Sequence, residues 1–477
     1  MTTAAPKYTE ARTSHWNQVA RKSDGGKSKG HYYHKRITHI YQFLVPPGQH
    51  ILEIGCGTGD LLAALKPASG VGTDFSSEMI KRGKNLHSEI RFIEADAHNL
   101  SEIEETFDVI ILSDLVNDLW DVQTVFKVIR RLSTSRTKVI INFYSRVWEL
   151  PLKLVQKLGL ANPTLMQNWL TAEDINDLLS LSDFEAIRNW TEILWPLDTT
   201  IVSTLLNRYL VKLWPFRYFA LTNFIIARPI HSEKKLKDNP IVSVIVPARN
   251  EAGNIEKIVE RTPEMGGGTE LIFVEGNSKD NTYEVIEKTL ENNPGRNLKL
   301  FKQPGVGKGD AVRLGFDKAN GEILMILDAD MTVPPEDLSR FHDALVQGKC
   351  EFANGVRLVY PMERQAMRYL NFLGNKFFSL AFSWLLGQPI KDTLCGTKVL
   401  WREDYEIIAA NRDYFGDFDP FGDFDLIFGA ARLNYKIIDI PIRYHERKYG
   451  TTNIDRWRHG WLLIKMVLFA MKKIKFV

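Results

Sequence analysis

The sequence is poor in cysteine and has no long apolar run. Its 477 residues include only three cysteines, Cys56, Cys350 and Cys395. Such sparse usage is typical of a reducing compartment and excludes a disulfide framework. No uninterrupted apolar stretch reaches the ~18 residues of a membrane span, and the first residues lack the apolar core of a signal peptide. We therefore expect a cytoplasmic protein that does not cross a membrane.

An excess of charge of either sign is also missing. Lysine and arginine number 61, aspartate and glutamate 58, and the formal net charge is +3. This balance gives no reason to expect a nucleic-acid partner. Hydrophobic residues make up 44% and charged residues 25%, as in ordinary globular proteins. The length suits two domains better than one.

A polar, lysine-rich run separates two apolar halves of the chain. It covers residues 231–240 and follows one apolar strand pattern and precedes another. We predict one domain at 1–230, a linker at 231–240 and a second domain at 241–477. In both halves, short and nearly continuous apolar runs alternate with helical patterns. This alternation predicts the α/β fold class twice, with parallel strands covered by helices on both faces.

The first half contains a glycine-rich turn directly after a predicted strand. The segment ILEIGCGTGD covers residues 51–60 and has glycine at 55, 57 and 59. Glycines at the carboxyl end of a strand allow the backbone to approach a ligand closely. A dinucleotide fingerprint would place glycine at position 60, where this chain has Asp60. The turn therefore indicates a ligand other than a dinucleotide.

Three acidic residues accompany the turn in order. Glu53 precedes it, Asp74 ends the next predicted strand at the spacing suited to ribose hydroxyls, and Asp96 ends the third. The pattern E-x-G-x-G-x-G, then D, then D resembles class I S-adenosylmethionine (SAM)-dependent methyltransferases over residues 45–145. The alternative is a cofactor-free core whose loops need glycine. The resemblance implies a Rossmann-like sheet, SAM as cofactor, and cofactor-binding roles for Glu53, Gly55, Cys56, Gly57, Gly59, Asp74, Asp96 and Ala97.

The chemistry of the first half is less visible. Methyl transfer from a sulfonium depends mainly on alignment. Asp114, Asn117 and Asp118 follow the fourth predicted strand, where such enzymes place groups near the methyl. Helix capping explains the same three residues equally well. Residues 147–215 are rich in leucine and tryptophan, and we expect them to form a substrate cap.

The second half has two aspartates at the end of an apolar strand. Residues 323–327 are all apolar, and Asp328, Ala329 and Asp330 follow them. Two carboxylates aimed at one point suit a hard divalent cation that holds a diphosphate. A D-x-D pair alone is common in solvated loops, so its surroundings decide the interpretation.

Those surroundings are ordered in a specific way. Residues 247–255 and 273–282 each end a predicted strand in polar residues, and the glycine-rich segment 305–316 precedes the D-x-D strand. Together these segments resemble the GT-A fold of family 2 glycosyltransferases over residues 241–455, and in particular the dolichyl-phosphate mannosyltransferase-like branch. The resemblance implies a nucleotide-diphospho-sugar donor, Mg2+ or Mn2+, and inversion at the anomeric carbon.

The resemblance also implies roles for individual residues. Asp328 and Asp330 would hold the metal. The residues implied to bind substrate are Pro247, Ala248, Asn250, Glu251, Glu275, Lys308, Arg357, Arg447 and Lys448. Two departures leave the nucleotide open: Glu275 stands in the segment Glu-Gly-Asn-Ser where relatives carry two aspartates, and Thr332 stands where they often carry glutamine.

The catalytic base depends on the acceptor. A hydroxyl acceptor needs a general base, for which Asp392 is the first candidate and Asp423 and Asp425 are alternatives. A phosphate monoester, with a second pKa near 6, is already anionic and needs cations more than a base. Both acceptor types stay open at this point.

The last residues form an apolar helical face flanked by lysines. This face consists of Trp457, Trp461, Ile464, Leu468 and Met471. Such a helix lies in a membrane interface or packs on its own domain. With the family resemblance, the first alternative indicates a polyprenyl-phosphate acceptor and peripheral contact with the inner membrane face.

The predicted function is therefore a bifunctional enzyme of glycan or glycolipid assembly. One domain transfers a sugar, and the other methylates a related molecule. Two alternatives remain: sugar transfer to a soluble glycan hydroxyl with methylation of the same glycan, and a first domain that binds SAM without consuming it.

Overall fold

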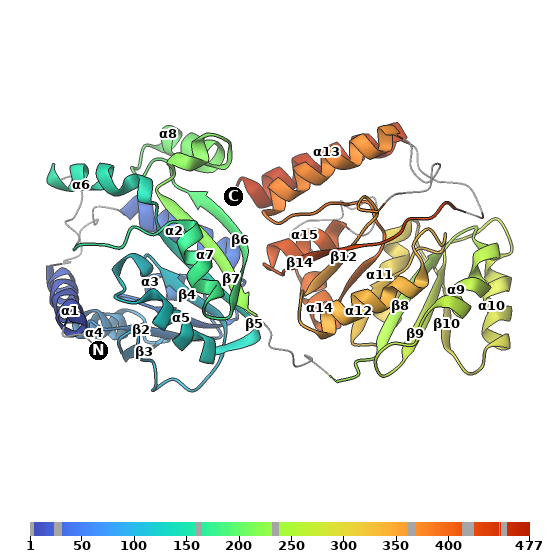
Figure 1. The fold of residues 1–477 in the computed structure, drawn as a ribbon, viewed down its shortest axis with the longest axis horizontal. Helices are drawn as coiled ribbons and strands as arrows, with labels where there is room; N and C mark the ends of the chain where they lie inside the picture. The colour runs from blue at the N-terminus through green and yellow to red at the C-terminus, as the bar shows by residue number, and fades with distance from the viewer. Residues whose placement is uncertain are drawn as a thin grey trace. The chain divides into compact units, whose positions relative to one another are not determined.

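The chain forms two compact units. The computed structural model describes residues 4–22, 31–158, 165–230, 238–360, 369–412, 424–447, 449 and 456–477. One unit comprises Met1–Ile230 with Phe476–Val477, and the other His231–Lys475 (Figure 1). Residues 231–237 of the predicted linker lie outside the described residues.

The first unit is built on a seven-stranded sheet with the order β3-β2-β1-β4-β5-β7-β6. Strands β1 to β5 all run parallel to one another, whereas β7 is antiparallel to both β5 and β6. The strands are β1 His50–Ile54, β2 Ser69–Asp74, β3 Arg91–Glu94, β4 Phe107–Ser113, β5 Ser133–Tyr144, β6 Phe184–Glu192 and β7 Thr222–Pro229.

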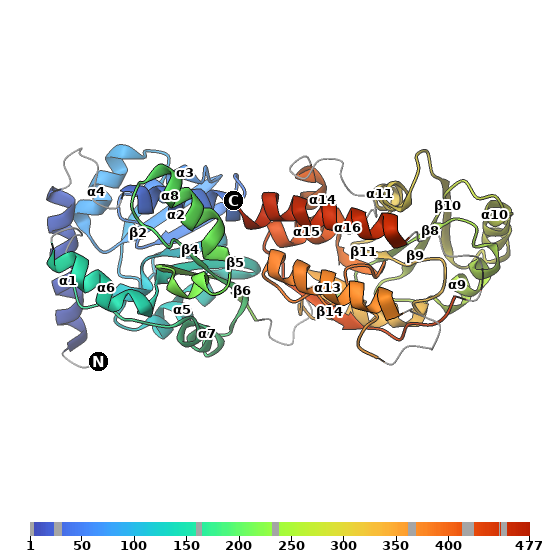
Figure 2. The same ribbon diagram turned by 90° about the horizontal axis from the view of Figure 1, so that it is seen from above.

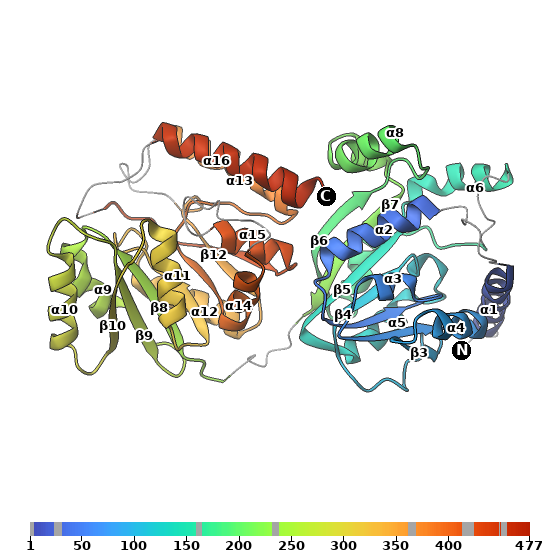
Figure 3. The same ribbon diagram turned by 180° about the vertical axis from the view of Figure 1, so that it is seen from behind.

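Helices cover both faces of this sheet. The helices are α1 Ala4–Lys22, α2 His31–Leu44, α3 Asp60–Ala64, α4 Ser77–Leu86, α5 Val122–Arg131, α6 Glu149–Lys157, α7 Ala172–Ser180 and α8 Thr200–Thr204. Leu52 and Ile54 of β1 share a buried core with α5 and α7, whereas Ile51, just before Leu52, faces α2, α3 and α4. Figures 1 and 3 show these two layers from opposite sides. Because successive side chains of a strand point to opposite faces, apolar residues are needed on both sides of β1.

The second unit is also built on a seven-stranded sheet, with the order β10-β9-β8-β11-β13-β12-β14. Only β13 runs antiparallel to its neighbours β11 and β12. The strands are β8 Val242–Ala248, β9 Thr269–Glu275, β10 Asn297–Lys302, β11 Ile323–Ile326, β12 Phe352–Val356, β13 Lys398–Trp401 and β14 Ile437–Pro441. The predicted α/β class is thus confirmed for both halves.

The helices of the second unit enclose its sheet. They are α9 Ile255–Arg261, α10 Thr282–Asn292, α11 Lys308–Lys318, α12 Leu338–Val346, α13 Tyr369–Leu386, α14 Arg402–Ala410, α15 Phe424–Arg432 and α16 Arg456–Ala470. Helices α13 and α16 run side by side (Figure 2) and contribute Phe382 and Met466 to one buried core. Among the helices that the structure describes, none combines the length and apolar character needed to cross a bilayer.

The two cores share no buried cluster, which generates a prediction about folding. Each hydrophobic cluster contains residues of one half only. Because a domain with its own core folds alone, we expect cleavage within residues 231–240 to release two fragments. Calorimetry should then record one melting transition for each fragment, close to the two transitions of the intact chain. Aggregation of both fragments would show that the halves depend on each other for folding.

Candidate active sites

The glycine turn of the first unit joins β1 to α3. Gly55, Gly57 and Gly59 have positive φ angles of 72°, 54° and 77°, a region that favours glycine. A Cβ added at Gly57 would meet no atom within 4 Å. The Gly57 N–H donates to Asp74 Oδ2 at 3.0 Å, and Ser76 N–H donates to Asp74 Oδ1 at 2.8 Å. Asp74 therefore fixes the conformation of the turn through these two hydrogen bonds. The space in front of Gly57 is open.

Glu53 on β1 is a buried carboxyl with spare hydrogen-bonding capacity. It is only 3% exposed, and burial raises its pKa to about 8. Its Oε2 atom has no hydrogen-bond partner among the described residues. A buried carboxyl of this kind favours a cationic partner. The residue thus fits the amino end of a bound SAM.

Asp96 follows β3 and is oriented by a histidine. His98 donates to Asp96 Oδ1 from its backbone at 2.9 Å, and its Nδ1 lies 2.6 Å from the same oxygen. The hydrogen bonds from His98 lower the pKa of Asp96 despite partial burial. On the far side of the ring, His98 Nε2 accepts from Asp121 N–H at 3.1 Å. Asp96 is therefore held as an ionised acceptor.

One cavity brings together part of the predicted cofactor set. Its wall contains Gly55, Asp74, Asp96 and Ala97. Among the residues that the structure describes, Glu53, Cys56, Gly57 and Gly59 are not part of this wall. The Cys56 sulfur instead faces Gly72 on β2, since a Cβ added there would lie 2.8 Å from it. Any role of Cys56 toward SAM would therefore come from its backbone.

Helix α1 closes the same cavity. Tyr8, Thr9 and Arg12 form part of its wall, which encloses about 20 Å³. Arg12 Nε lies 3.3 Å from Asp118 Oδ1, and Trp16 Nε1 donates to Asp118 Oδ2 at 3.1 Å. The enclosed space is too small for SAM, but a wider cavity of about 1040 Å³ shares Thr9, Asp96, His98 and Trp120 with its wall. The sequence analysis missed this helix, although Tyr8, Arg12 and Trp16 recur every four residues.

The residues after β4 are tied into the fold. Asp114 has a φ of 54° and accepts hydrogen bonds from Tyr33 Oη at 2.8 Å and Asn142 Nδ2 at 2.7 Å. Burial raises the pKa of Asp114 to about 7. Asn117 Oδ1 accepts from Tyr144 N–H at 2.9 Å. In this part of the structure the helix cap is Asp121, whose carboxylate accepts from Thr124 N–H at the start of α5.

In the second unit, Asp328 is paired with a lysine. Asp328 and Asp330 follow β11, and Lys308 begins α11. Lys308 Nζ lies 2.6 Å from Asp328 Oδ1. Burial alone would raise the pKa of Asp328, but the lysine ammonium outweighs it and the pKa is lowered. The carboxylate is therefore ionised at neutral pH.

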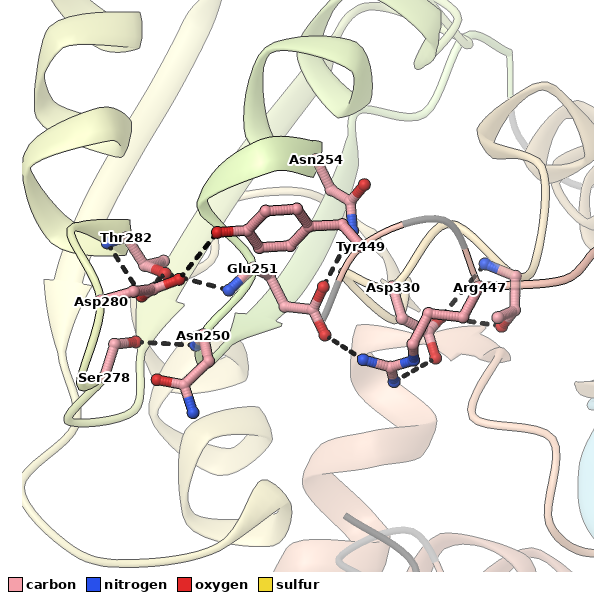
Figure 4. A network of polar contacts seen from close by, with 10 residues as sticks. Asn250, Glu251, Asn254, Ser278, Asp280, Thr282, Asp330, Arg447 and Tyr449 are labelled. Atoms are coloured by element: carbon pink, nitrogen blue, oxygen red, sulfur yellow. Dashed lines mark hydrogen bonds and ion pairs between the residues drawn. The ribbon is translucent and has the colours of Figure 1, made fainter. Parts of the chain in front are cut away.

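Asp330 is paired with an arginine from the far end of the unit. Arg447 Nη2 donates to Asp330 Oδ2 at 2.8 Å, and Nη1 donates to Glu251 Oε1 at 2.6 Å (Figure 4). Thr332 Oγ1 donates to the other oxygen of Asp330 at 2.7 Å. Each aspartate of the D-x-D pair thus has its own cation. Thr332, the residue that departs from relatives, is bonded to the pair itself.

A glycine lets the backbone approach the Lys308–Asp328 pair. A Cβ added at Gly396 would lie 2.0 Å from Asp328 Oδ2 and 2.3 Å from Lys308 Nζ. Both distances are far below ordinary van der Waals contact. A side chain at position 396 would therefore displace this pair or the segment before β13.

The loop after β8 forms a polar wall beside the pair (Figure 4). Asn250 has a φ of 57°; its N–H donates to Ser278 Oγ at 3.0 Å, and its Oδ1 accepts from Lys279 N–H at 2.7 Å. Glu251 N–H donates to Thr282 Oγ1 at 3.0 Å. The predicted residue Glu275, at the end of β9, accepts from Ser278 N–H. The ends of β8 and β9 are thus joined around the predicted nucleotide pocket.

Two further predicted residues are less accessible. Pro247 is half-buried and Ala248 is only 1% exposed, both on β8. Ala248 therefore offers a ligand little beyond its backbone. Tyr449, which the sequence analysis did not single out, packs on this wall: its ring lies 2.5 Å from a Cβ added at Gly253, and its Oη lies 3.4 Å from Asp280 Oδ2.

Comparison with known proteins identifies both halves. The sequence model of the methyltransferase domain matches residues 51–135, and that of glycosyl transferase family 2 matches residues 243–409. The chain is a family 2 glycosyltransferase fused to a methyltransferase. The D-x-D pair and the glycine turn lie inside these two matches. The first unit is therefore the methyltransferase unit and the second the glycosyltransferase unit.

Curated relatives are similar to about half of the chain. Glycosyltransferase AglJ of Haloferax volcanii is 29% identical over 224 residues, covering 46% of this chain and 69% of the relative. Dolichol-phosphate mannosyltransferase of Pyrococcus furiosus is 32% identical over 235 residues, covering 47% and 64%. An undecaprenyl-phosphate 4-deoxy-4-formamido-L-arabinose transferase of Pseudomonas aeruginosa is 25% identical over 238 residues, covering 49% and 66%. Each match spans about two thirds of the relative.

The predicted base of the glycosyltransferase unit is engaged in an ion pair. Arg357 donates to both oxygens of Asp392, from Nε at 2.7 Å and from Nη2 at 2.9 Å. Asp392 is fully buried, which would raise its pKa, but Arg357 outweighs burial and lowers it. Such a carboxylate is a weak proton acceptor. The catalytic role of Asp392 and the phosphate-binding role of Arg357 stay predictions. The ion pair between them does not favour Asp392 as a general base.

The remaining predicted residues divide into two groups. Asp425 is buried and pairs with Arg412 Nε at 3.0 Å. Asp423 and Lys448 lie outside the described residues. The functional roles of all these site residues remain predictions, to be tested by substitution.

Glu53 generates a pH-dependent prediction. Its ordinary pKa is 4.5 and its folded-state pKa about 8, so between these values the folded state holds a proton that the unfolded state has lost. The free energy of unfolding of the SAM-free methyltransferase unit should therefore fall as pH rises from about 5 to 8. Glu53→Gln should reduce this slope, to which Asp114 with its raised pKa of about 7 also contributes, and should raise the melting temperature at pH 8 while weakening SAM binding. Calorimetry from pH 5 to 8 checks it, and an unchanged slope in the variant would contradict it.

Gly396 generates a prediction about the donor site. Gly396→Ala should displace the Lys308–Asp328 pair and lower nucleotide-sugar turnover by about 10–100-fold, as misplacement near 1 Å does elsewhere. Gly295→Ala is the matched control, because a Cβ there meets nothing within 4 Å. Turnover of the donor by both purified variants is the measurement. Equal activity of the two variants would show that the close approach is not needed.

Proposed function

We propose that the glycosyltransferase unit transfers a sugar from a nucleotide-diphospho-sugar to a polyprenyl phosphate with inversion, and that the methyltransferase unit transfers a methyl group from SAM. The observation that carries the proposal is the double pairing of Lys308 with Asp328 and of Arg447 with Asp330. It concentrates carboxylates and cations at the edge of a family 2 sheet. A metal-bound diphosphate needs both kinds of group.

The residues at this edge fit Mg2+ or Mn2+. Hard divalent cations take carboxylate oxygens as ligands, and Asp328 and Asp330 would hold the ion. Among the described residues, no histidine, cysteine or further acidic residue joins the two aspartates in a group that could hold a metal ion. Oxygens of the sugar donor and water would therefore complete the coordination of the ion. When bound, the ion supplies positive charge to the diphosphate leaving group. Lys308 and Arg447 offer further charge to the same phosphates once their carboxylates bind the ion.

A phosphate acceptor agrees with the state of Asp392. In this reaction an oxygen of the polyprenyl phosphate attacks the anomeric carbon, and the bond from that carbon to the nucleoside diphosphate breaks. The attacking oxygen is already anionic because its second pKa is near 6, so no general base is required. Two of the relatives are named for dolichol phosphate and undecaprenyl phosphate. A hydroxyl acceptor would need a free base, yet Asp392 and Asp425 are both paired with arginines.

The helices of the glycosyltransferase unit support contact with a membrane surface. Trp461 and Leu468 of α16 are 58% and 57% exposed, whereas Leu463 and Met466 on its other face are buried. On the apolar face singled out in the sequence, Trp461, Ile464 and Leu468 thus point to solvent, whereas Met471 packs against the core of the unit. The side chain of Trp457 lies outside the described residues. On the neighbouring α13, Leu380 is 73% exposed. Two adjacent helices with outward apolar faces suit a lipid interface.

The donor site can be tested by removing one ligand charge. Asp330→Asn keeps the size of the side chain, so the fold should survive. Nucleoside diphosphate release should fall by orders of magnitude, because charge stabilisation at such sites contributes several kcal/mol. Chelator should produce the same loss in the wild type, and SAM binding should stay intact. The exposed Asp317 offers a matched control, Asp317→Asn, with wild-type turnover.

Two outcomes would contradict the proposal in different ways. Full turnover in Asp330→Asn, or in metal-stripped wild type, would show that Asp328 and Asp330 hold no catalytic metal ion and only belong to a solvated loop. Product formed on soluble glycans but not on polyprenyl phosphate would leave the metal site in place and reject the acceptor. For the other unit, trace methyl turnover on extracted lipids and glycans distinguishes methyl transfer from SAM binding alone.

A further inference from the structure

The methyltransferase unit presents an apolar stripe on α6. Leu150, Leu154 and the residue that ends the helix, Leu158, are 75%, 59% and 63% exposed. Because they are spaced by four residues, they lie on one face of the helix. No residue of α6 itself is buried. The helix therefore contributes little to the core of the unit, and its stripe faces away from the protein.

A second exposed apolar segment adjoins this helix. Within residues 197–219, Ile201 is 83%, Trp214 75% and Phe219 60% exposed. Trp148, just before α6, donates from Nε1 to Phe219 O at 2.8 Å, which joins the two segments. Figures 1 and 3 show α6 and α8 at the same edge of the unit. We call residues 145–158 and 197–219 together the cap surface.

The cap surface is also basic. Its two segments contain six lysines and arginines but only two acidic residues, Glu149 and Asp198. The side chain of Lys212 is buried in an ion pair with Glu192, so the basic residues that are exposed are Arg146, Lys153, Lys157, Arg208 and Arg217. Glu149 is paired with Lys153 at 2.8 Å. Arg217 donates to Tyr218 Oη at 3.0 Å, which places a guanidinium beside the exposed aromatic ring. Apolar, aromatic and cationic side chains are therefore interleaved over the whole surface.

We propose that the cap surface docks the methyltransferase unit onto an anionic lipid bilayer. Monomeric proteins seldom leave apolar patches of this extent in water. A hydrophobic protein partner would not require the surplus of positive charge, whereas an anionic leaflet attracts basic residues near its surface. Tryptophan and tyrosine beside basic residues are characteristic of the membrane interface. Charge complementarity thus selects a lipid surface as the occupant.

This docking has a consequence for the methyl acceptor. A unit held on the bilayer meets molecules that are anchored there, so the methyl acceptor is a lipid-linked glycan. That consequence rests on the proposed function of the glycosyltransferase unit, which would supply lipid-linked sugars at the same surface. The docking itself depends only on the side chains of the cap surface.

The test measures binding of the full chain to vesicles. Sedimentation with phosphatidylglycerol–phosphatidylcholine vesicles is compared with phosphatidylcholine alone, at low and high salt. The cap variant carries Leu150→Ser, Leu154→Ser and Ile201→Ser. Its matched control carries Leu86→Ser and Leu181→Ser, at leucines that are 59% and 65% exposed but lie outside the cap surface. Both sets are also made in a chain with Trp461→Ser and Leu468→Ser on α16, so that the two units are scored separately.

We expect the cap variant to bind anionic vesicles at least about tenfold more weakly than the control, because it can no longer bury three large apolar side chains in lipid. Melting temperature and SAM binding should not change. Equal binding of cap variant and control would overturn the proposal, as would binding indifferent to lipid charge. A cap variant that alters only the oligomeric state would assign the surface to a second copy of the chain and reject docking on lipid. Loss of binding only in the α16 variant would reject the cap surface and leave the proposed function standing.

Discussion

Both units depend on parallel strands that are buried on both faces. Such a strand cannot carry polar side chains along its length without burying them, so polar residues concentrate where the strand ends. Because neighbouring parallel strands end at one edge, these residues meet. In the methyltransferase unit this edge carries the glycine turn, Asp74 and Asp96. In the glycosyltransferase unit it carries Asn250, Glu275 and the D-x-D pair.

Charge compensation is the second constraint on the donor site. Asp328, Asp330 and Glu251 would repel one another at close range without cations. Lys308 reaches Asp328 from the start of α11, and Arg447 reaches the other two from beyond β14. The same groups that neutralise one another in the ligand-free protein include those that a metal and a diphosphate would engage. In the function proposed above, ligand binding would therefore be an exchange of ionic partners, which costs less than creating a buried charge anew.

Both units also leave apolar side chains facing outward. In the glycosyltransferase unit these belong to α13 and α16, and in the methyltransferase unit to the cap surface. From the sequence alone, these apolar faces could equally have been expected to pack against the core, because an amphipathic helix usually packs its apolar face inward. None of the described helices is long and apolar enough to cross a membrane. The proposed contact with lipid therefore depends on these outward-facing side chains.

The sequence by itself determined the α/β class, the order of the motifs and the places where polar residues leave the strands. These features depend on local pattern: runs of apolar residues, glycine at turns and acids at strand ends. Only the tertiary structure decided that α1 closes the cofactor cavity through Asp118, that Arg357 neutralises Asp392, and that Arg447 reaches Asp330. Each of these contacts joins residues at least 35 positions apart. Local patterns carry no information about such pairs, because chain folding, not spacing along the sequence, sets the distance between them. The same holds for the exposed face of α16, whose period is visible in the sequence but whose direction depends on which face finds a partner in the core.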